Sequence, residues 1–166
     1  MGAVVRFPLF VYGTLQDEQV LSRVLGRPAR PGGRAELVDR AAFTVIGERF
    51  PVLRPLPGAR TEGRLLTGLC EQDLHRLGWY EGDEYRLVDC SVIDLAHRRR
   101  VAARLFEADE RLVAGPQRWS LARWQDVHRP AFLNDVGRWM AGYDATRPAL
   151  SSNELSDPSS PAPDPS

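Results

Sequence analysis

The chain has 166 residues, 43% of them hydrophobic and 27% charged, which is enough for one globular domain with a core of its own. Its 22 basic residues, all arginine, equal its 22 acidic residues, and this balance argues against binding to nucleic acid or to an anionic membrane. Only two cysteines are present, and no apolar stretch is long enough for a signal peptide or a membrane span. We therefore expect a reduced, cytoplasmic protein.

The composition changes sharply only near the C-terminus. Residues 151–166 are mostly Ser, Pro and Asp, and such a segment cannot bury enough apolar surface to offset its ordering entropy. We predict a folded domain over residues 1–150 and a disordered tail over residues 151–166. The tail is either a plain solvated segment or a site that recruits a partner.

The first predicted elements are a strand and a helix joined by a glycine. Residues 8–12 are apolar and rich in β-formers, which predicts a buried strand that ends at Gly13. Thr14 and Asp17 resemble a capping box, and apolar residues at helical spacing follow until Gly26. The strand should therefore turn directly into a helix.

The middle of the chain predicts a sheet. Four short strands are expected around residues 35–38, 42–46, 52–56 and 63–69, followed by a short helix over 72–77. Two longer strands, 85–95 and 100–106, should face each other across a polar turn at 97–99.

The last part of the folded region is predicted to be helical. Its apolar residues recur near a 3.6-residue period, and Pro130 should divide the stretch into two helices, the second starting there. We expect these side chains to face the core: Leu121, Trp124, Val127, Phe132, Val136, Trp139 and Met140. Together the elements predict an α+β domain, a small mixed β-barrel with helices on its outside.

Two places in the sequence carry residues suited to chemistry. At the turn Tyr12-Gly13-Thr14-Leu15 a strand leads into a helix, where free backbone N–H groups can receive a carboxylate or an oxyanion. Residues 79–85 place three carboxylates among three aromatic side chains, and partial desolvation would raise the pKa of an acid there. Taken separately, the first fits a tight turn equally well, and the second a solvated acidic loop.

Four motifs in this order resemble the gamma-glutamylcyclotransferase-like family over roughly residues 9–140. They are Val-Tyr-Gly-Thr-Leu at 11–15, Phe-Pro-Val-Leu-Arg-Pro at 50–55, Thr-Glu-Gly-Arg-Leu at 61–65 and Leu-Gly-Trp-Tyr-Glu-Gly-Asp-Glu-Tyr at 77–85. Gly78 departs from the family pattern, which usually has Asp at this place.

The resemblance implies a barrel with a cavity that binds a small gamma-glutamyl compound. In the family's reaction the α-amine of the glutamyl group attacks its own γ-amide carbonyl, and 5-oxoproline and an amine are released. Glu81 matches the general acid/base, and the N–H groups of Gly13, Thr14 and Leu15 would hold the substrate carboxylate or polarise the γ-carbonyl. The reaction needs no cofactor and no metal, and the three histidines lack ligand spacing.

Four further residues are candidates for the cavity wall. Tyr12 is expected at the wall, Phe50 and Pro51 at the opening, and Tyr85 either hydrogen-bonds the acid or the substrate or is a plain core tyrosine. Selectivity for the leaving amine is expected to lie in the segments 27–34 and 107–119. We expect a monomer or a homodimer.

Two alternatives remain open. The scaffold can carry a related enzyme that processes gamma-glutamyl amines or isopeptides, or a non-catalytic barrel that binds a small molecule. The presence of Glu81 favours an enzyme.

Overall fold

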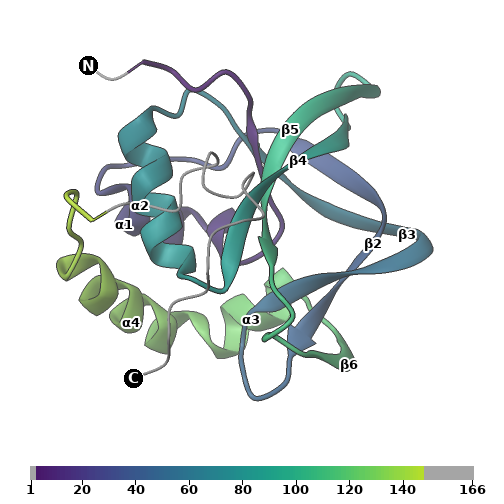
Figure 1. Ribbon diagram of the computed structural model, residues 1–166. Helices are drawn as coiled ribbons and strands as arrows, with labels where there is room; N and C mark the ends of the chain where they lie inside the picture. Colours follow the sequence, from purple (N-terminus) through teal and green to yellow (C-terminus); the bar gives the residue numbers. More distant parts are fainter. Residues whose placement is uncertain (1–2, 148–166) are drawn as a thin grey trace, which may run out of the picture.

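A computed structural model describes residues 3–147 and shows a closed five-stranded barrel with helices packed against it (Figure 1). The predicted tail lies outside the described residues. Around the barrel the strands follow the order β3 (Pro51–Leu66), β1 (Leu9–Val11), β5 (Arg99–Ala108), β4 (Tyr85–Asp94) and β2 (Arg34–Val45). Pairing of β2 with β3 closes the ring, and β6 (Ala114–Arg118) adds to the outer side of β2. The predicted mixed barrel is confirmed, because β1 and β5 are parallel and the other pairs antiparallel.

The four short strands predicted in the middle of the chain are in fact two long ones. β2 and β3 pair from Arg34↔Arg64 to Thr44↔Pro51, with one irregularity between Val38 and Arg40. Asp39 has a φ of 63° there, so the ladder bends without ending. The prediction was wrong because it took the prolines and charged residues of this hairpin for turns.

Strand β6 was not predicted. Its sequence, Ala-Gly-Pro-Gln-Arg, contains two residues that are depleted in strands. It lies at the edge of the sheet, which is the position where a strand tolerates proline.

The helices are η1 (Thr14–Gln16), α1 (Glu18–Leu25), α2 (Glu71–Glu81), α3 (Leu121–Val127) and α4 (Arg129–Ala141). Pro130 lies in the first turn of α4, which confirms the predicted division. The helix predicted over 72–77 is longer at its C-terminal end and includes Glu81. None of the described helices is long and apolar enough to cross a membrane.

The start of α1 differs from the prediction. Strand β1 leads first into the single 3-10 turn η1, and the N-cap of α1 is Asp17, not Thr14. The Asp17 side chain accepts hydrogen bonds from the backbone N–H groups of Gln19 and Val20. Its other oxygen accepts from Gln125 at 2.9 Å and from Arg129 at 3.1 Å, so this one carboxylate joins α1 to α3 and α4.

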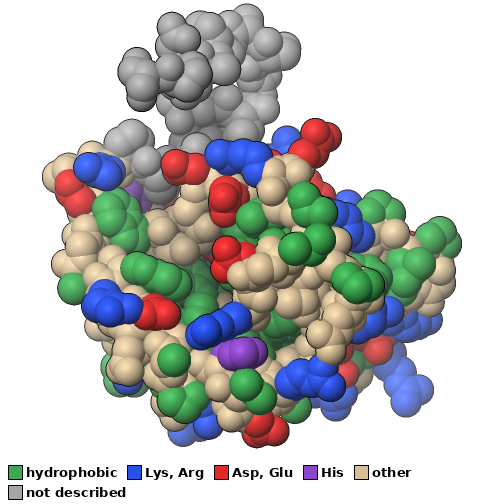
Figure 2. All heavy atoms as spheres, turned by 90° about the horizontal axis from the view of Figure 1, so that it is seen from below, with side chains coloured by type: hydrophobic (Ala, Val, Ile, Leu, Met, Phe, Trp, Pro, Cys, Tyr) green, Lys and Arg blue, Asp and Glu red, His purple; other side chains and the backbone are tan. Residues whose placement is uncertain are grey.

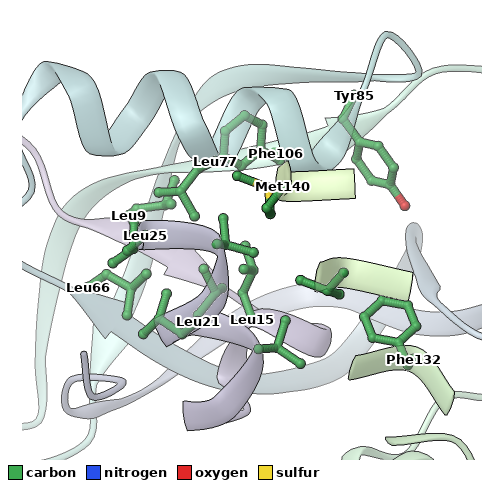
Figure 3. Close-up of a cluster of buried hydrophobic side chains, with 14 of the residues drawn as sticks. Leu9, Leu15, Leu21, Leu25, Leu66, Leu77, Tyr85, Phe106, Phe132 and Met140 are labelled. Carbon is green, nitrogen blue, oxygen red and sulfur yellow. The ribbon is translucent and has the colours of Figure 1, made fainter. Parts of the chain in front are cut away.

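Two clusters of buried side chains form the core. One fills the barrel, and the other lies between the barrel and the helices α1, α2 and α4, which gather on one side of it in Figure 1. Figure 3 shows the second cluster, in which Leu9, Leu21, Leu66 and Leu77 face one another. Three of the predicted core residues of the last helices are not buried: Val127 is 64% exposed, Trp139 is 48% exposed and Leu121 is only partly buried.

We predict that Asp17→Ala lowers the free energy of unfolding by about 2–4 kcal/mol, because the change removes a helix cap and leaves Arg129 without its buried partner. The matched control is Glu18→Ala, whose exposed side chain lies 3.7 Å from Arg30 and should contribute at most about 0.5 kcal/mol. Urea unfolding of both variants measures the difference. Equal stabilities would contradict this role of Asp17.

Candidate active site

A cavity of about 230 Å³ lies where the turn after β1, the end of α2, the start of β3 and helix α4 meet. Figure 2 looks onto this side of the molecule, where hydrophobic side chains surround a hollow and acidic side chains stand beside it. All the candidate residues named from the sequence line the cavity: Tyr12, Gly13, Thr14, Leu15, Phe50, Pro51, Glu81 and Tyr85. Residues that are far apart in the chain are thus brought to one place.

Glu81 is the last residue of α2, and the following glycine determines where the helix ends. Gly82 has φ 80° and ψ −177°, a backbone conformation that is essentially restricted to glycine. The chain therefore turns into β4 directly after Glu81, whose side chain borders the cavity. This requirement explains the glycine of the Tyr-Glu-Gly motif.

The carboxyl group of Glu81 has no counter-charge. Burial raises its pKa from 4.5 to about 8, and no described residue forms an ion pair or a side-chain hydrogen bond with it. Desolvation disfavours the charged form, and nothing nearby restores it. The group can therefore both take up and give up a proton near neutral pH.

Three backbone N–H groups belong to the turn residues that line the cavity. Those of Gly13, Thr14 and Leu15 have no hydrogen-bond partner among the described residues, whereas the next two, of Gln16 and Asp17, bond to carbonyls within the turn. The sequence predicted that these groups stand at the start of an α-helix, and this is wrong. They belong to the 3-10 turn, so an anion would be held by the N–H groups themselves and not by the dipole of α1.

Tyr80 connects the two halves of the site. Its hydroxyl shares a hydrogen bond of 2.5 Å with the hydroxyl of Thr14, in the turn, while its backbone adjoins Glu81. Its ring lies 6.5 Å from the rings of both Phe132 and Trp139, on α4. These contacts fix the positions of three elements relative to one another. They are the C-terminal end of α2, which carries Glu81, the turn after β1, and α4.

The other two tyrosines of the cavity donate their hydroxyls to backbone carbonyls and not to Glu81. Tyr12 donates to the carbonyl of Phe106 at 2.7 Å, and Tyr85 donates to the carbonyl of Pro51 at 3.2 Å. Burial raises the pKa of both phenols, so they remain neutral. Tyr85 is buried, as expected of a core tyrosine, and it also lines the cavity, but its hydroxyl bonds to the backbone and not to Glu81.

Several cavity residues were missed by the sequence reasoning. Tyr80 lies within the motif that identified Glu81, so its position was a usable signal. Phe132 and Trp139 follow the helical period of core residues, and no sequence signal separates a cavity wall from a core. The complete set of missed residues is Phe10, Val11, Tyr80, Glu84, Phe106, Phe132 and Trp139.

The segments expected to form the cavity mouth do not line it. No residue of 27–34 or 107–119 borders the cavity, and its wall away from the turn is formed instead by Phe50, Glu84, Phe132 and Trp139. Within residues 3–147 no three His, Cys, Asp or Glu side chains are grouped as metal ligands would be.

Comparison with known proteins identifies relatives along most of the chain. A family model described as "Gamma-glutamyl cyclotransferase, AIG2-like" matches residues 9–126. AIG2-like protein D of Arabidopsis thaliana is 27% identical over 139 residues, which cover 80% of this chain and 88% of the relative. AIG2-like protein A of the same plant is 25% identical over 136 residues, 80% of each chain. A solved structure named gamma-glutamyl cyclotransferase has a TM-score of 0.55 at 14% identity, covers 90% of this chain and 96% of its own, and shows the shared fold.

The raised pKa of the partly buried Glu81 makes a prediction about stability. The folded state keeps the Glu81 proton up to pH about 8, whereas the unfolded chain loses it near 4.5, so the wild type loses stability as pH rises between these values. Glu81→Gln removes this loss. Its advantage over the wild type should grow from near zero at pH 4.5 to a few kcal/mol at pH 8, since one pKa unit corresponds to about 1.4 kcal/mol.

Chemical unfolding at several pH values measures this difference. The matched control is Glu71→Gln, an exposed position at the start of the same helix, whose stability should run parallel to that of the wild type. If the stability of Glu81→Gln also changes with pH in parallel with that of the wild type, the raised pKa of Glu81 is contradicted.

Proposed function

Because this chain belongs to the gamma-glutamyl cyclotransferase, AIG2-like, family, we propose that it converts a gamma-glutamyl group to 5-oxoproline and releases an amine. The observation that carries this proposal is the position of Glu81, a carboxyl group of raised pKa that shares one cavity with three unbonded N–H groups. The first group suits proton transfer, and the second suits an anionic part of a substrate.

The substrate's α-carboxylate is assigned to the turn. Of the other polar groups of the cavity, the Tyr12 and Tyr85 hydroxyls donate to carbonyls, and the hydrogen bond between the Thr14 and Tyr80 hydroxyls leaves one hydroxyl hydrogen, beside the turn, for a ligand. Backbone N–H groups are fixed in direction, so they need no reorganisation to hold charge. The glutamyl α-amine is then assigned to Glu81.

The reaction needs two proton transfers through Glu81. Glu81 takes a proton from the α-ammonium group, and the freed amine attacks the γ-carbonyl carbon to form the N–C bond of a five-membered ring. The tetrahedral intermediate collapses with cleavage of the original amide C–N bond as the Glu81 carboxyl gives its proton to the departing nitrogen. The ring nitrogen, which still carries two hydrogens, then loses one of them to the Glu81 carboxylate, and this proton leaves with the amine as its ammonium form. No water is consumed, and the products are 5-oxoproline and the free amine.

The pKa of Glu81 matches the group that it must deprotonate. A free α-amino group titrates at about 8, so proton transfer between it and a carboxyl of pKa about 8 has nearly no free-energy cost. General acid–base help of this kind contributes roughly 10²–10⁴ in rate. Because the attack is intramolecular, a folded-back glutamyl chain held by the turn adds a further large factor.

We predict that Glu81→Gln releases 5-oxoproline at least about a hundredfold more slowly than the wild type, because an amide cannot exchange a proton in this way. The variant should remain folded and bind 5-oxoproline with unchanged affinity, as measured by calorimetry, since the turn that holds the carboxylate is intact. Glu71→Gln, the same chemical change elsewhere on α2, should keep full activity. Wild-type activity in Glu81→Gln would exclude the mechanism.

We also predict a bell-shaped dependence of kcat/KM on pH with a maximum near 8. The productive complex contains one proton, which is carried by either Glu81 or the substrate amine. The population of this complex falls below pH 8, where both groups are protonated, and above pH 8, where neither group is protonated. Below pH 7 the value should fall about tenfold per unit. A plateau that extends down to pH 5 would show that Glu81 titrates at its ordinary pKa and would contradict the assignment.

A further inference from the structure

The last turn of α2, which carries Glu81, is a weak piece of helix by itself. Gly78 begins this turn and Gly82 follows it, and the N–H group of Gly82 donates to the carbonyl of Gly78 at 3.0 Å. Glycine is the poorest helix former after proline, because it loses the most backbone entropy when it is ordered. Contacts from outside the helix must therefore hold Glu81 in its place at the cavity.

Trp79, two residues before Glu81, makes such contacts with the end of α4 and with the residues beyond it. Its indole N–H donates to the carbonyl of Trp139 at 3.2 Å. Its ring lies edge-to-face with that of Tyr143 at 5.7 Å, and the guanidinium group of Arg147 lies 5.9 Å from its centre. Trp79 does not line the cavity, so these contacts act on the helix and not on a ligand.

Tyr143 and Arg147 belong to a segment that follows α4 and packs back onto α2. We call this segment, residues 142–147, the clasp. The Tyr143 hydroxyl bonds to Nδ1 of His75 at 2.7 Å, and Nε2 of His75 lies 2.5 Å from the carbonyl oxygen of Arg147. Because a carbonyl only accepts, Nε2 carries a hydrogen and, in the neutral ring, Nδ1 accepts from Tyr143. Both ring nitrogens of a side chain on α2 are thus bonded to the clasp.

Further contacts give the clasp a defined shape and a second attachment. The Asp144 carboxylate accepts from the backbone N–H of Thr146 at 2.9 Å and from its hydroxyl at 2.7 Å. The guanidinium group of Arg76 covers the Tyr143 ring at 4.6 Å, while its Nε donates to the carbonyl of Val24 at 2.6 Å. The clasp is therefore attached to α2 and, through Arg76, to α1.

We propose that Trp79 and Tyr143 are positioning residues for Glu81, and that the clasp holds the last turn of α2 against α4 so that the carboxyl group stays in the cavity. This rests on the proposed function and adds to it two residues that lie outside the cavity. When the clasp is released, the turn between the two glycines frays and water reaches the Glu81 carboxyl. The pKa of Glu81 then falls toward 4.5, because desolvation is what raises it.

Three variants test this role through the rate of 5-oxoproline release, measured with the gamma-glutamyl amides of butylamine and of alanine. Tyr143→Ala removes the ring from Trp79, and Trp79→Phe removes the N–H that reaches α4. Each should lower kcat about tenfold and change KM less than about threefold, since the turn that holds the carboxylate is intact. Tyr143→Phe keeps the ring on Trp79 and loses only the bond to His75, one helical turn further from Glu81. It should keep kcat within about twofold of the wild type.

A second measurement does not depend on activity. The stability that Glu81→Gln gains between pH 4.5 and pH 8 reports how strongly burial acts on the acid. Chemical unfolding should show that this gain is at least about twofold smaller when Tyr143→Ala or Trp79→Phe is also present. The matched control is Phe43→Ala, which removes a half-buried ring beneath Arg118, at 5.5 Å, on β2 and outside the cavity. Phe43→Ala should change neither this gain nor kcat.

The possible failures are distinguishable. A folded wild type that releases 5-oxoproline from neither amide overturns the proposed function, and the unfolding measurement still decides whether the clasp holds the acid. A Glu81→Gln gain that is unchanged by Tyr143→Ala and by Trp79→Phe overturns the positioning role and leaves the reaction standing. An equal decrease with Phe43→Ala also overturns it, because the effect is then a general loosening of the fold. If Tyr143→Ala does not fold, Trp79→Phe decides the same question.

Discussion

The closure of the barrel by strand β1 determines where everything else in the site can lie. β1 has only three residues, yet it pairs with β3 on one side and with β5 on the other. Gly63 permits this closeness, because a Cβ atom at that position would lie 2.3 Å from the carbonyl oxygen of Val11. The glycine of the Thr-Glu-Gly motif is thus required by packing against Val11 and Phe10, two residues that line the cavity. Since β1 is held on both sides, the turn that follows it is delivered to a fixed place.

The same constraint explains how free N–H groups persist beside a helix. A chain that left β1 directly into an α-helix would direct its first amides along the helix axis. Here Asp17 caps α1 and satisfies its amides, and the 3-10 turn that precedes it keeps the amides of Gly13, Thr14 and Leu15 unbonded. Arg129 and Gln125 hold Asp17 in turn. The fold therefore separates the cap of α1 from the turn with the unbonded N–H groups, whereas the sequence pattern predicted both as one helix start.

Prediction from the sequence succeeded where local chemistry decides the structure. The strands on either side of the 97–99 turn, the break at Pro130 and the α+β barrel follow from residue type and spacing, and the candidate site residues do border one cavity. The prediction failed where contacts between residues far apart in the sequence decide the structure. The long β2–β3 hairpin passes through prolines that usually end strands, and β6 forms because β2 offers an open edge. The outward position of Trp139 depends on what α4 packs against, and the spacing of apolar residues along the sequence does not reveal this.

The uncompensated carboxyl group of Glu81 borders the cavity, and burial there raises its pKa at a cost in stability. An arginine beside Glu81 would stabilise the fold at neutral pH, but it would lower the pKa of the acid and remove its ability to exchange a proton there. The chain has arginines in abundance, and many of them pair with acids elsewhere on the surface. No arginine of the described residues lines the cavity, so burial of the Glu81 carboxyl is not offset by a positive charge and its pKa stays raised.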